Sequence, residues 1–291
     1  MQTLEEFRHR HDFLICIDSD GCAFDVMEIK HKECFCPAFI EHFSLQPIAK
    51  YAREAWEFVN LYSSTRGIHR LLALLRVMEL LPRRAEVVER GFAVPKLEGL
   101  RRYVESGAKL SNDGLAAYLA EHPSETDVET TLRWSKDTNE RIGRLVHGVP
   151  PFPHVRESLK EIAQKAEVVI VSATQQLALE REWKENGILP YVSLVCGQEQ
   201  GSKAAIIAKL APQYEASKIL MIGDAPGDRD AAHQNGALFY PVCPDQEAAS
   251  WAAFAQSGER FFAGTYAGSY EKELLDHFDQ LLPENPSWKM V

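Results

Sequence analysis

Two pairs of aspartates are the residues of this sequence best suited to chemistry. One residue separates Asp18 from Asp20, and three residues separate Asp224 from Asp228. Carboxylates that gather at one site repel one another unless a cation or a proton relieves the charge. Magnesium is the natural cation, because it binds a few carboxylates, keeps water and accepts phosphate oxygens. Each pair taken alone has an ordinary alternative as a helix cap or turn former.

A serine and a lysine stand in comparable places further along the chain. Ser172 closes an apolar run and supplies a hydroxyl, and the backbone amides that follow it, beginning with Ala173, are placed to face an anion. Lys203 opens a segment with helical spacing and supplies a fixed positive charge. The alternative for either side chain is a helix cap or a solvated surface group.

The elements that would position these residues are short apolar runs typical of strands buried on both faces. These runs are Phe13 to Asp18, Val168 to Ser172, Ile219 to Asp224 and Ala237 to Val242. Segments with helical spacing lie between them, at 155–165, 175–186 and 203–210. Strands that alternate with helices predict a parallel α/β sheet flanked by helices. Such sheets bind ligands beyond the carboxyl ends of their strands, where Asp18, Ser172 and Asp224 fall.

The segment from 25 to 149 has a different pattern, with no clear buried strand. Amphipathic helical stretches follow one another at 48–62, 68–81, 97–105, 114–121 and 125–146. Pro150, Pro151 and Pro153 then mark a stiff return to the sheet. We therefore expect a discontinuous α/β core domain of residues 1–24 and 150–291, with an all-helical domain of residues 25–149 inserted in it. Residues 245–291 predict one or two helices whose role the sequence does not assign.

Composition excludes several classes of protein. The 291 residues are 45% apolar and carry 42 acidic against 32 basic side chains, a formal charge of −10. A surface of that charge repels nucleic acid and anionic lipid, and no apolar stretch is long enough to span a bilayer. Six cysteines form no disulfide framework, so we expect a cytoplasmic protein. His31, Cys34, Cys36 and His42 use zinc-ligand residue types but fit no closed zinc site well.

The chain resembles the haloacid dehalogenase (HAD) superfamily. The resemblance rests on the order of Asp18-x-Asp20, Ser172, Lys203 and Gly223-Asp224-x-x-x-Asp228, which corresponds to that family's four short motifs between residues 13 and 242. The helical insertion after the first motif is similar to the family's α-helical cap. This implies a Rossmann-like core of parallel strands and a cap domain that closes over the active site and selects substrate.

The resemblance also implies a role for each motif residue. Asp18 would attack phosphorus and form an aspartyl-phosphate, and Asp20 would act as general acid and then as general base. Ser172, Ala173 and Lys203 would hold the phosphoryl oxygens. Magnesium would be bound by the side chains of Asp18 and Asp224 and by the backbone carbonyl of Asp20, and Asp228 would reach it directly or through water. Because Asp20 is present, phosphate ester chemistry is favoured over dehalogenation.

We therefore expect a magnesium-dependent phosphatase that acts on a small-molecule phosphate ester. The alternatives are a phosphomutase of the same superfamily and a catalytically quiet binding protein that has kept the fold. Arg66, in the loop 63–67, is a candidate for substrate contact, and its alternative is a helix-terminus turn with a solvated arginine. Cys22 has no evident histidine partner that would make it a nucleophile. The sequence identifies neither the substrate nor the oligomeric state.

Overall fold

The computed structural model describes residues 3–291 and contains two compact units. The first, here called the α/β unit, consists of the chain up to Met27 together with Gly148–Leu281. The second, the helical unit, consists of Glu28–His147 together with Leu282–Val291. Residues 282–291, which the sequence had placed with the core, thus group with the helical unit. The helices of the described residues include none that is long and apolar enough to cross a membrane.

The α/β unit is built on one five-stranded sheet in which every strand pairing is parallel. Its strands are β1 (Phe13–Ile17), β2 (Ala166–Val171), β3 (Leu194–Cys196), β4 (Ile219–Gly223) and β5 (Leu238–Pro241), in the order β3-β2-β1-β4-β5. The four apolar runs of the sequence form β1, β2, β4 and β5, which confirms the predicted α/β fold. The three-residue β3 was not predicted.

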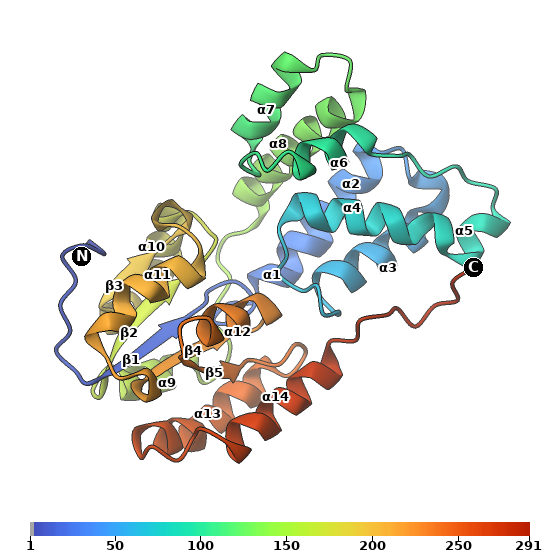
Figure 1. Cartoon of the computed structure of the whole chain (residues 1–291). Helices are drawn as coiled ribbons and strands as arrows, with labels where there is room; N and C mark the ends of the chain where they lie inside the picture. The colour runs from blue at the N-terminus through green and yellow to red at the C-terminus, as the bar shows by residue number, and fades with distance from the viewer. Residues whose placement is uncertain (1–2) are drawn as a thin grey trace. The chain divides into compact units, whose positions relative to one another are not determined.

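Helices cover both faces of this sheet, as Figure 1 shows. They are α9 (Val155–Ile162), α10 (Gln176–Glu185), α11 (Lys203–Leu210), α12 (Pro226–His233), α13 (Glu247–Phe262) and α14 (Ser269–Leu281). Helices α11 and α12 pack against each other, and so do α9 and α13. Their apolar faces bury strands whose side chains are almost all inaccessible to water, as the near-continuous apolar runs required.

Helix α14 and the turn before it protect an edge of the sheet. The exposed edge of β5 would otherwise leave backbone groups without partners. At Phe239 the N–H donates to Glu271 Oε1 (2.9 Å) and the carbonyl accepts from the Tyr266 hydroxyl (2.7 Å). Glu271 belongs to α14, and Tyr266 lies in the turn before it. Residues 245–281, whose role the sequence left unassigned, therefore complete the α/β unit.

The helical unit begins within α1 (Val26–Ile29), which continues through a π-helical turn at Lys30–Phe35. It then contains α2 (Cys36–His42), α3 (Ala49–Asn60), α4 (Arg70–Leu80), α5 (Ala85–Glu89), α6 (Glu98–Glu105), α7 (Asn112–Glu121) and α8 (Thr126–Leu145). The five predicted helical stretches correspond to α3, α4, α6, α7 and α8. Trp56, Trp134 and Phe39 lie at the centre of its apolar core. Cys34 and Cys36 are buried, and the His42 ring pairs with Asp137.

Residues 282–291, here called the strap, lie against the segment that joins α4 to α5. The Val291 N–H donates to the carbonyl of Arg83 (2.8 Å), and the Ala85 N–H donates to the carbonyl of Lys289 (3.1 Å). Between these bonds the buried guanidinium of Arg84 lies 4.6 Å from the ring of Trp288. The indole also makes an edge contact with Phe58 of α3. The strap is therefore an integral part of the helical unit.

Candidate active site

The register of the three central strands brings the predicted residues to one edge of the sheet. Ile17 of β1 pairs with Ile170 of β2 on one side and with Ile222 of β4 on the other. The residue after β1 is Asp18, whose N–H donates to the carbonyl of Ile222 (3.0 Å). Ser172 and Asp224 follow the neighbouring strands at the same level. The strand ends of a parallel sheet thus position the polar side chains, as the sequence predicted.

Three carboxylates meet at this edge. Asp18, Asp224 and Asp228 each place one carboxylate oxygen within 4.8 Å of the others, and all three residues are buried. Within residues 3–291 no second group of three acidic, histidine or cysteine side chains is gathered in this way. A donor set made only of carboxylate oxygens suits a hard divalent cation.

Asp228 is fixed by the start of α12. Its Oδ2 accepts hydrogen bonds from the N–H groups of Asp224 and Ala225, both at 3.2 Å. The carboxylate thereby satisfies two backbone donors that the beginning of a helix leaves open. Gly223 makes this approach possible, because a Cβ at that position would lie 2.5 Å from the Cβ of Asp228. The glycine at the end of β4 is therefore required by packing.

Lys203 brings a positive charge into the cluster. Its Nζ lies 2.8 Å from Asp18 Oδ2 and 2.5 Å from Asp228 Oδ1. The lysine opens α11, which is capped by Ser202 through the N–H of Ala205. Burial lowers the pKa of Lys203, but the carboxylates of Asp18 and Asp228 outweigh it and hold the pKa above its ordinary value. The lysine thus stays charged.

The same neighbours act on the carboxyl group of Asp18. Burial raises its pKa to about 8, because removal from water penalises the charged form. The charge of Lys203 opposes this rise, whereas the carboxylates of Asp228 and Asp224 add to it. The group would be ionised more readily if a cation lay among the three carboxylates.

Asp20 and Ser172 lie at this edge in a network that includes an unpredicted residue, Thr174. The hydroxyl of Thr174 donates to Asp20 Oδ2 at 2.9 Å. The Thr174 N–H donates in turn to the hydroxyl of Ser172 at 3.3 Å, and Ser172 is buried. Ala173, between them, is exposed. The only sequence signal for Thr174 is its place two residues after Ser172, in the loop that follows β2.

Arg66 and Cys22 are both buried. Arg66 belongs to the helical unit, and its guanidinium donates to the carbonyl of Leu61 (2.9 Å), at the end of α3. It is thus not a solvated arginine, and its contact with substrate stays a prediction. The Cys22 thiol donates to the carbonyl of Ile222 (3.6 Å). Burial raises the pKa of this thiol well above its ordinary value, which disfavours the thiolate that a nucleophile needs.

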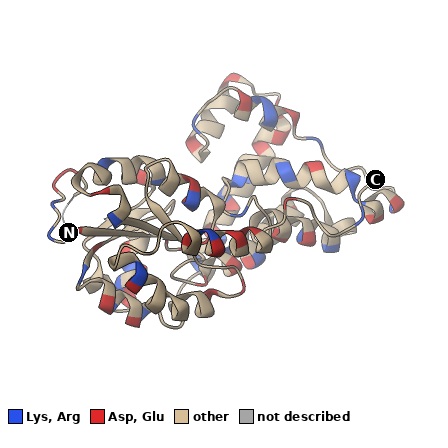
Figure 2. Cartoon of the chain, turned by 60° about the horizontal axis from the view of Figure 1, so that its bottom comes forward, with Lys and Arg blue, Asp and Glu red and all other residues tan. Residues whose placement is uncertain are grey.

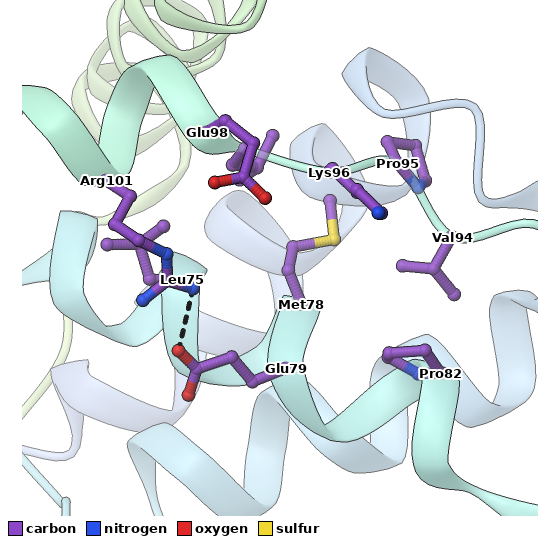
Figure 3. A pocket seen from close by; sticks show the side chains of 10 residues that line it. Leu75, Met78, Glu79, Pro82, Val94, Pro95, Lys96, Glu98 and Arg101 are labelled. Atoms are coloured by element: carbon purple, nitrogen blue, oxygen red, sulfur yellow. Dashed lines mark hydrogen bonds and ion pairs between the residues drawn. The ribbon is translucent and has the colours of Figure 1, made fainter.

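A separate hollow of about 170 Å³ lies in the helical unit. Figure 3 shows the apolar side chains of Leu75 and Met78 among its walls and charged side chains around them. The charge of Arg101 is engaged there by Glu79, at 2.9 Å. None of the predicted site residues lines this hollow. In the view of Figure 2 acidic and basic residues are mixed along the helices.

The sequence matches a family model. Residues 94–242, just over half of the chain, match the model described as haloacid dehalogenase-like hydrolase. The chain therefore belongs to the haloacid dehalogenase-like hydrolase family, and it is a hydrolase by class. The matched range contains Ser172, Lys203, Asp224 and Asp228, whereas Asp18 precedes it.

Several solved structures are similar to this chain. A haloacid dehalogenase-like hydrolase from Streptococcus pneumoniae has 15% identity and a TM-score of 0.43, over 82% of this chain and 90% of that chain. A predicted phosphoglycolate phosphatase from Haemophilus somnus 129pt has 17% identity and a TM-score of 0.43, over 85% and 99%. A HAD-superfamily hydrolase of subfamily IA from Geobacter sulfurreducens PCA has 15% identity and a TM-score of 0.37, over 80% and 88%. No curated protein matches the sequence.

Proposed function

We propose that this hydrolase is a magnesium-dependent phosphatase that acts on a small phosphorylated metabolite. The observation that carries the proposal is the buried cluster of Asp18, Asp224 and Asp228 with Lys203 in contact with two of them. Three carboxylates and one ammonium leave an excess of negative charge at a single point. A hard cation balances that charge, and the anionic phosphate group of a substrate is then attracted to the site.

The residues present fit magnesium. Its ligands would be the side chains of Asp18, Asp224 and Asp228, with the backbone carbonyl of Asp20. When bound, the ion would neutralise the carboxylates, favour the ionised form of Asp18 and polarise a phosphoryl oxygen. The side-chain donor atoms are all carboxylate oxygens, and all three carboxylates are buried. Both observations support this assignment.

In the first step an oxygen of Asp18 bonds to phosphorus while the bond from phosphorus to the leaving oxygen breaks. Asp20 gives its proton to that oxygen, and the product leaves as an alcohol. In the second step water attacks the aspartyl-phosphate and Asp20 takes a proton from it. The bond from phosphorus to Asp18 then breaks, which restores the carboxylate and yields inorganic phosphate.

Three groups at the sheet edge would hold the transferring phosphoryl group. The ammonium of Lys203 and the hydroxyl of Ser172 would bind its oxygens, and the exposed Ala173 would contribute its backbone N–H. Such donors stabilise charge that spreads over the oxygens during transfer. Two carboxylates contact the ammonium of Lys203 and fix its position.

Hydrolysis of an aryl phosphate, with and without a chelator, tests the proposal. We expect Asp18→Asn to abolish turnover while the fold is kept, because the amide has the same shape but is not a nucleophile. A matched control is Asp276→Asn, which alters an exposed aspartate of α14. Activity that survives in Asp18→Asn, or that ignores removal of divalent ions, would contradict the proposal. Release of free phosphate, as opposed to its return to a sugar, separates a phosphatase from a phosphomutase.

A further inference from the structure

We propose that Thr174 is a positioning residue for Asp20, which fixes the orientation of the carboxyl group that gives its proton to the leaving oxygen. The inference rests on the proposed phosphatase function and assigns a role to a residue outside the four motifs. Its starting point is the 2.9 Å hydrogen bond from the Thr174 hydroxyl to Asp20 Oδ2. The two residues are far apart in sequence and come from the loops after β1 and β2.

The backbone of Thr174 is anchored on both sides. Its N–H donates to the hydroxyl of Ser172 (3.3 Å), and its carbonyl accepts from the N–H of Gln198 (3.0 Å) in the segment that follows β3. That segment approaches closely because residue 197 is glycine. A Cβ there would lie 2.7 Å from the carbonyl oxygen of Thr174. The loop is therefore fastened to two neighbouring strand ends.

The backbone of Asp20 is anchored independently. Gly21 adopts a positive φ of 79°, and its N–H donates to the carbonyl of Phe24 (2.8 Å) in a tight turn. The N–H groups of Ala23 and Phe24 both donate to the carbonyl of Ser19, at 2.9 and 3.0 Å. Since both partners have a fixed backbone, the hydrogen bond between their side chains is formed with little further loss of freedom.

The side chain chosen for this contact suits a positioning role. A threonine is branched at Cβ, which restricts its first side-chain torsion and so limits the directions open to its hydroxyl. The Asp20 carboxyl, in contrast, turns easily about a broad terminal torsion. Proton transfer from a general acid needs hydrogen-bond geometry to the leaving oxygen. Loss of the threonine hydroxyl should therefore slow the step that depends on the proton, and leave steps that do not need it unchanged.

Leaving-group dependence tests this role. For Thr174→Val, which keeps the shape and removes the hydroxyl, we expect kcat/KM to fall about tenfold or more with an alkyl phosphate, whose leaving oxygen needs the proton. With 2,4-dinitrophenyl phosphate, whose leaving group departs unprotonated, the fall should stay below about threefold. The parameter kcat/KM is compared because it reports the steps up to release of the leaving group. Thr174→Ser, which keeps the hydroxyl, should restore most of the loss.

A matched control removes another threonine hydroxyl from the same unit. Thr265→Val breaks a hydrogen bond to the carbonyl of Arg260, in an exposed turn, and should change neither substrate's kcat/KM. In an Asp20→Asn background, Thr174→Val should have no further effect on the alkyl phosphate, because the acid it orients is gone.

Each result of these kinetic measurements either supports or overturns the positioning role of Thr174. Equal losses on both substrates, no loss on either, or failure of Thr174→Ser to restore activity would overturn the positioning role. Wild-type protein that hydrolyses neither phosphate would instead refute the proposed function itself. Thermal unfolding of each variant, compared with wild type, shows whether a loss of activity reflects a loss of fold.

Discussion

Replacement of Gly223 by alanine is the sharpest test of how the acidic cluster is built. The added Cβ would lie 2.5 Å from both Cβ and Oδ2 of Asp228, a separation that real atoms do not tolerate. Either the end of β4 or the first turn of α12 must move. Asp228 would then lose its hydrogen bonds from the N–H groups of Asp224 and Ala225. Lys203 would lose one of its two carboxylate partners.

The expected cost follows from these contacts. Overpacking a tight site costs about 1–3 kcal/mol, and hydrogen bonds to a charged group contribute about 1.5–3 kcal/mol each. Because the two bonds share one carboxylate and part of the strain relaxes, we expect a total loss of about 3–5 kcal/mol of unfolding free energy for the α/β unit. At about 2–4 °C per kcal/mol for a unit of this size, the melting temperature should fall by about 10 °C.

Calorimetric unfolding of Gly223→Ala beside Gly227→Ala provides the assay. Gly227 lies four residues further on in the first turn of α12, and a Cβ there would meet nothing within 4 Å. This control should be neutral or stabilising by about 0.4–1 kcal/mol, because alanine restricts the unfolded chain. A Gly223→Ala protein with the same melting temperature as the wild type would refute the packing argument for this glycine.

Three further predictions concern other parts of the molecule. The raised pKa of about 8 keeps Asp18 protonated at lower pH, so the affinity for Mg²⁺ should rise with pH and level off above about pH 8. Thermal-shift titrations with Mg²⁺ measure this affinity, and an affinity independent of pH would contradict the prediction. Trp288→Ala, which uncovers the Arg84 guanidinium, should destabilise the helical unit by about 2 kcal/mol in urea unfolding. An unchanged midpoint of the urea transition would show that the strap does not stabilise this unit. Glu271→Ala should lower the unfolding free energy of the α/β unit by about 1–3 kcal/mol and speed hydrogen exchange at the Phe239 amide, because that amide loses its acceptor. Glu271→Gln, which keeps an acceptor oxygen, serves as the control.

Much of the α/β unit is predictable from the sequence because its strands are buried on both faces. The runs that became β1, β2, β4 and β5 are almost wholly apolar, so no alternation is needed to recognise them. Strand β3 has only three residues, too few for a pattern to stand out from a buried turn. Helix α12 was also missed, because its sequence is dominated by Asp228 and other polar residues and has few apolar positions.

The site shows where such prediction stops. Asp18, Ser172 and Asp224 follow recognisable strands, so their convergence depends only on the rule that parallel strands end at one edge. Thr174 and the packing role of Gly223 depend on distances between loops, which periodicity does not contain. Arg66 was considered as either a substrate contact or a solvated turn residue, yet its guanidinium is buried at the end of α3. Whether a polar side chain donates to a carbonyl close by in the chain depends on three-dimensional packing.

The strap also affects how the two units can be separated for engineering. Excising residues 28–147 would remove Arg84 and Phe58, the two side chains that contact the indole of Trp288. It would also remove the backbone groups that bond to Val291 and Lys289, so the indole would be exposed to water. A minimal hydrolase core designed from this chain should therefore stop at Leu281. A graft of the helical unit onto another scaffold must conversely supply its final ten residues as a second piece. Insertion and tail form one transplantable module encoded at two distant sites.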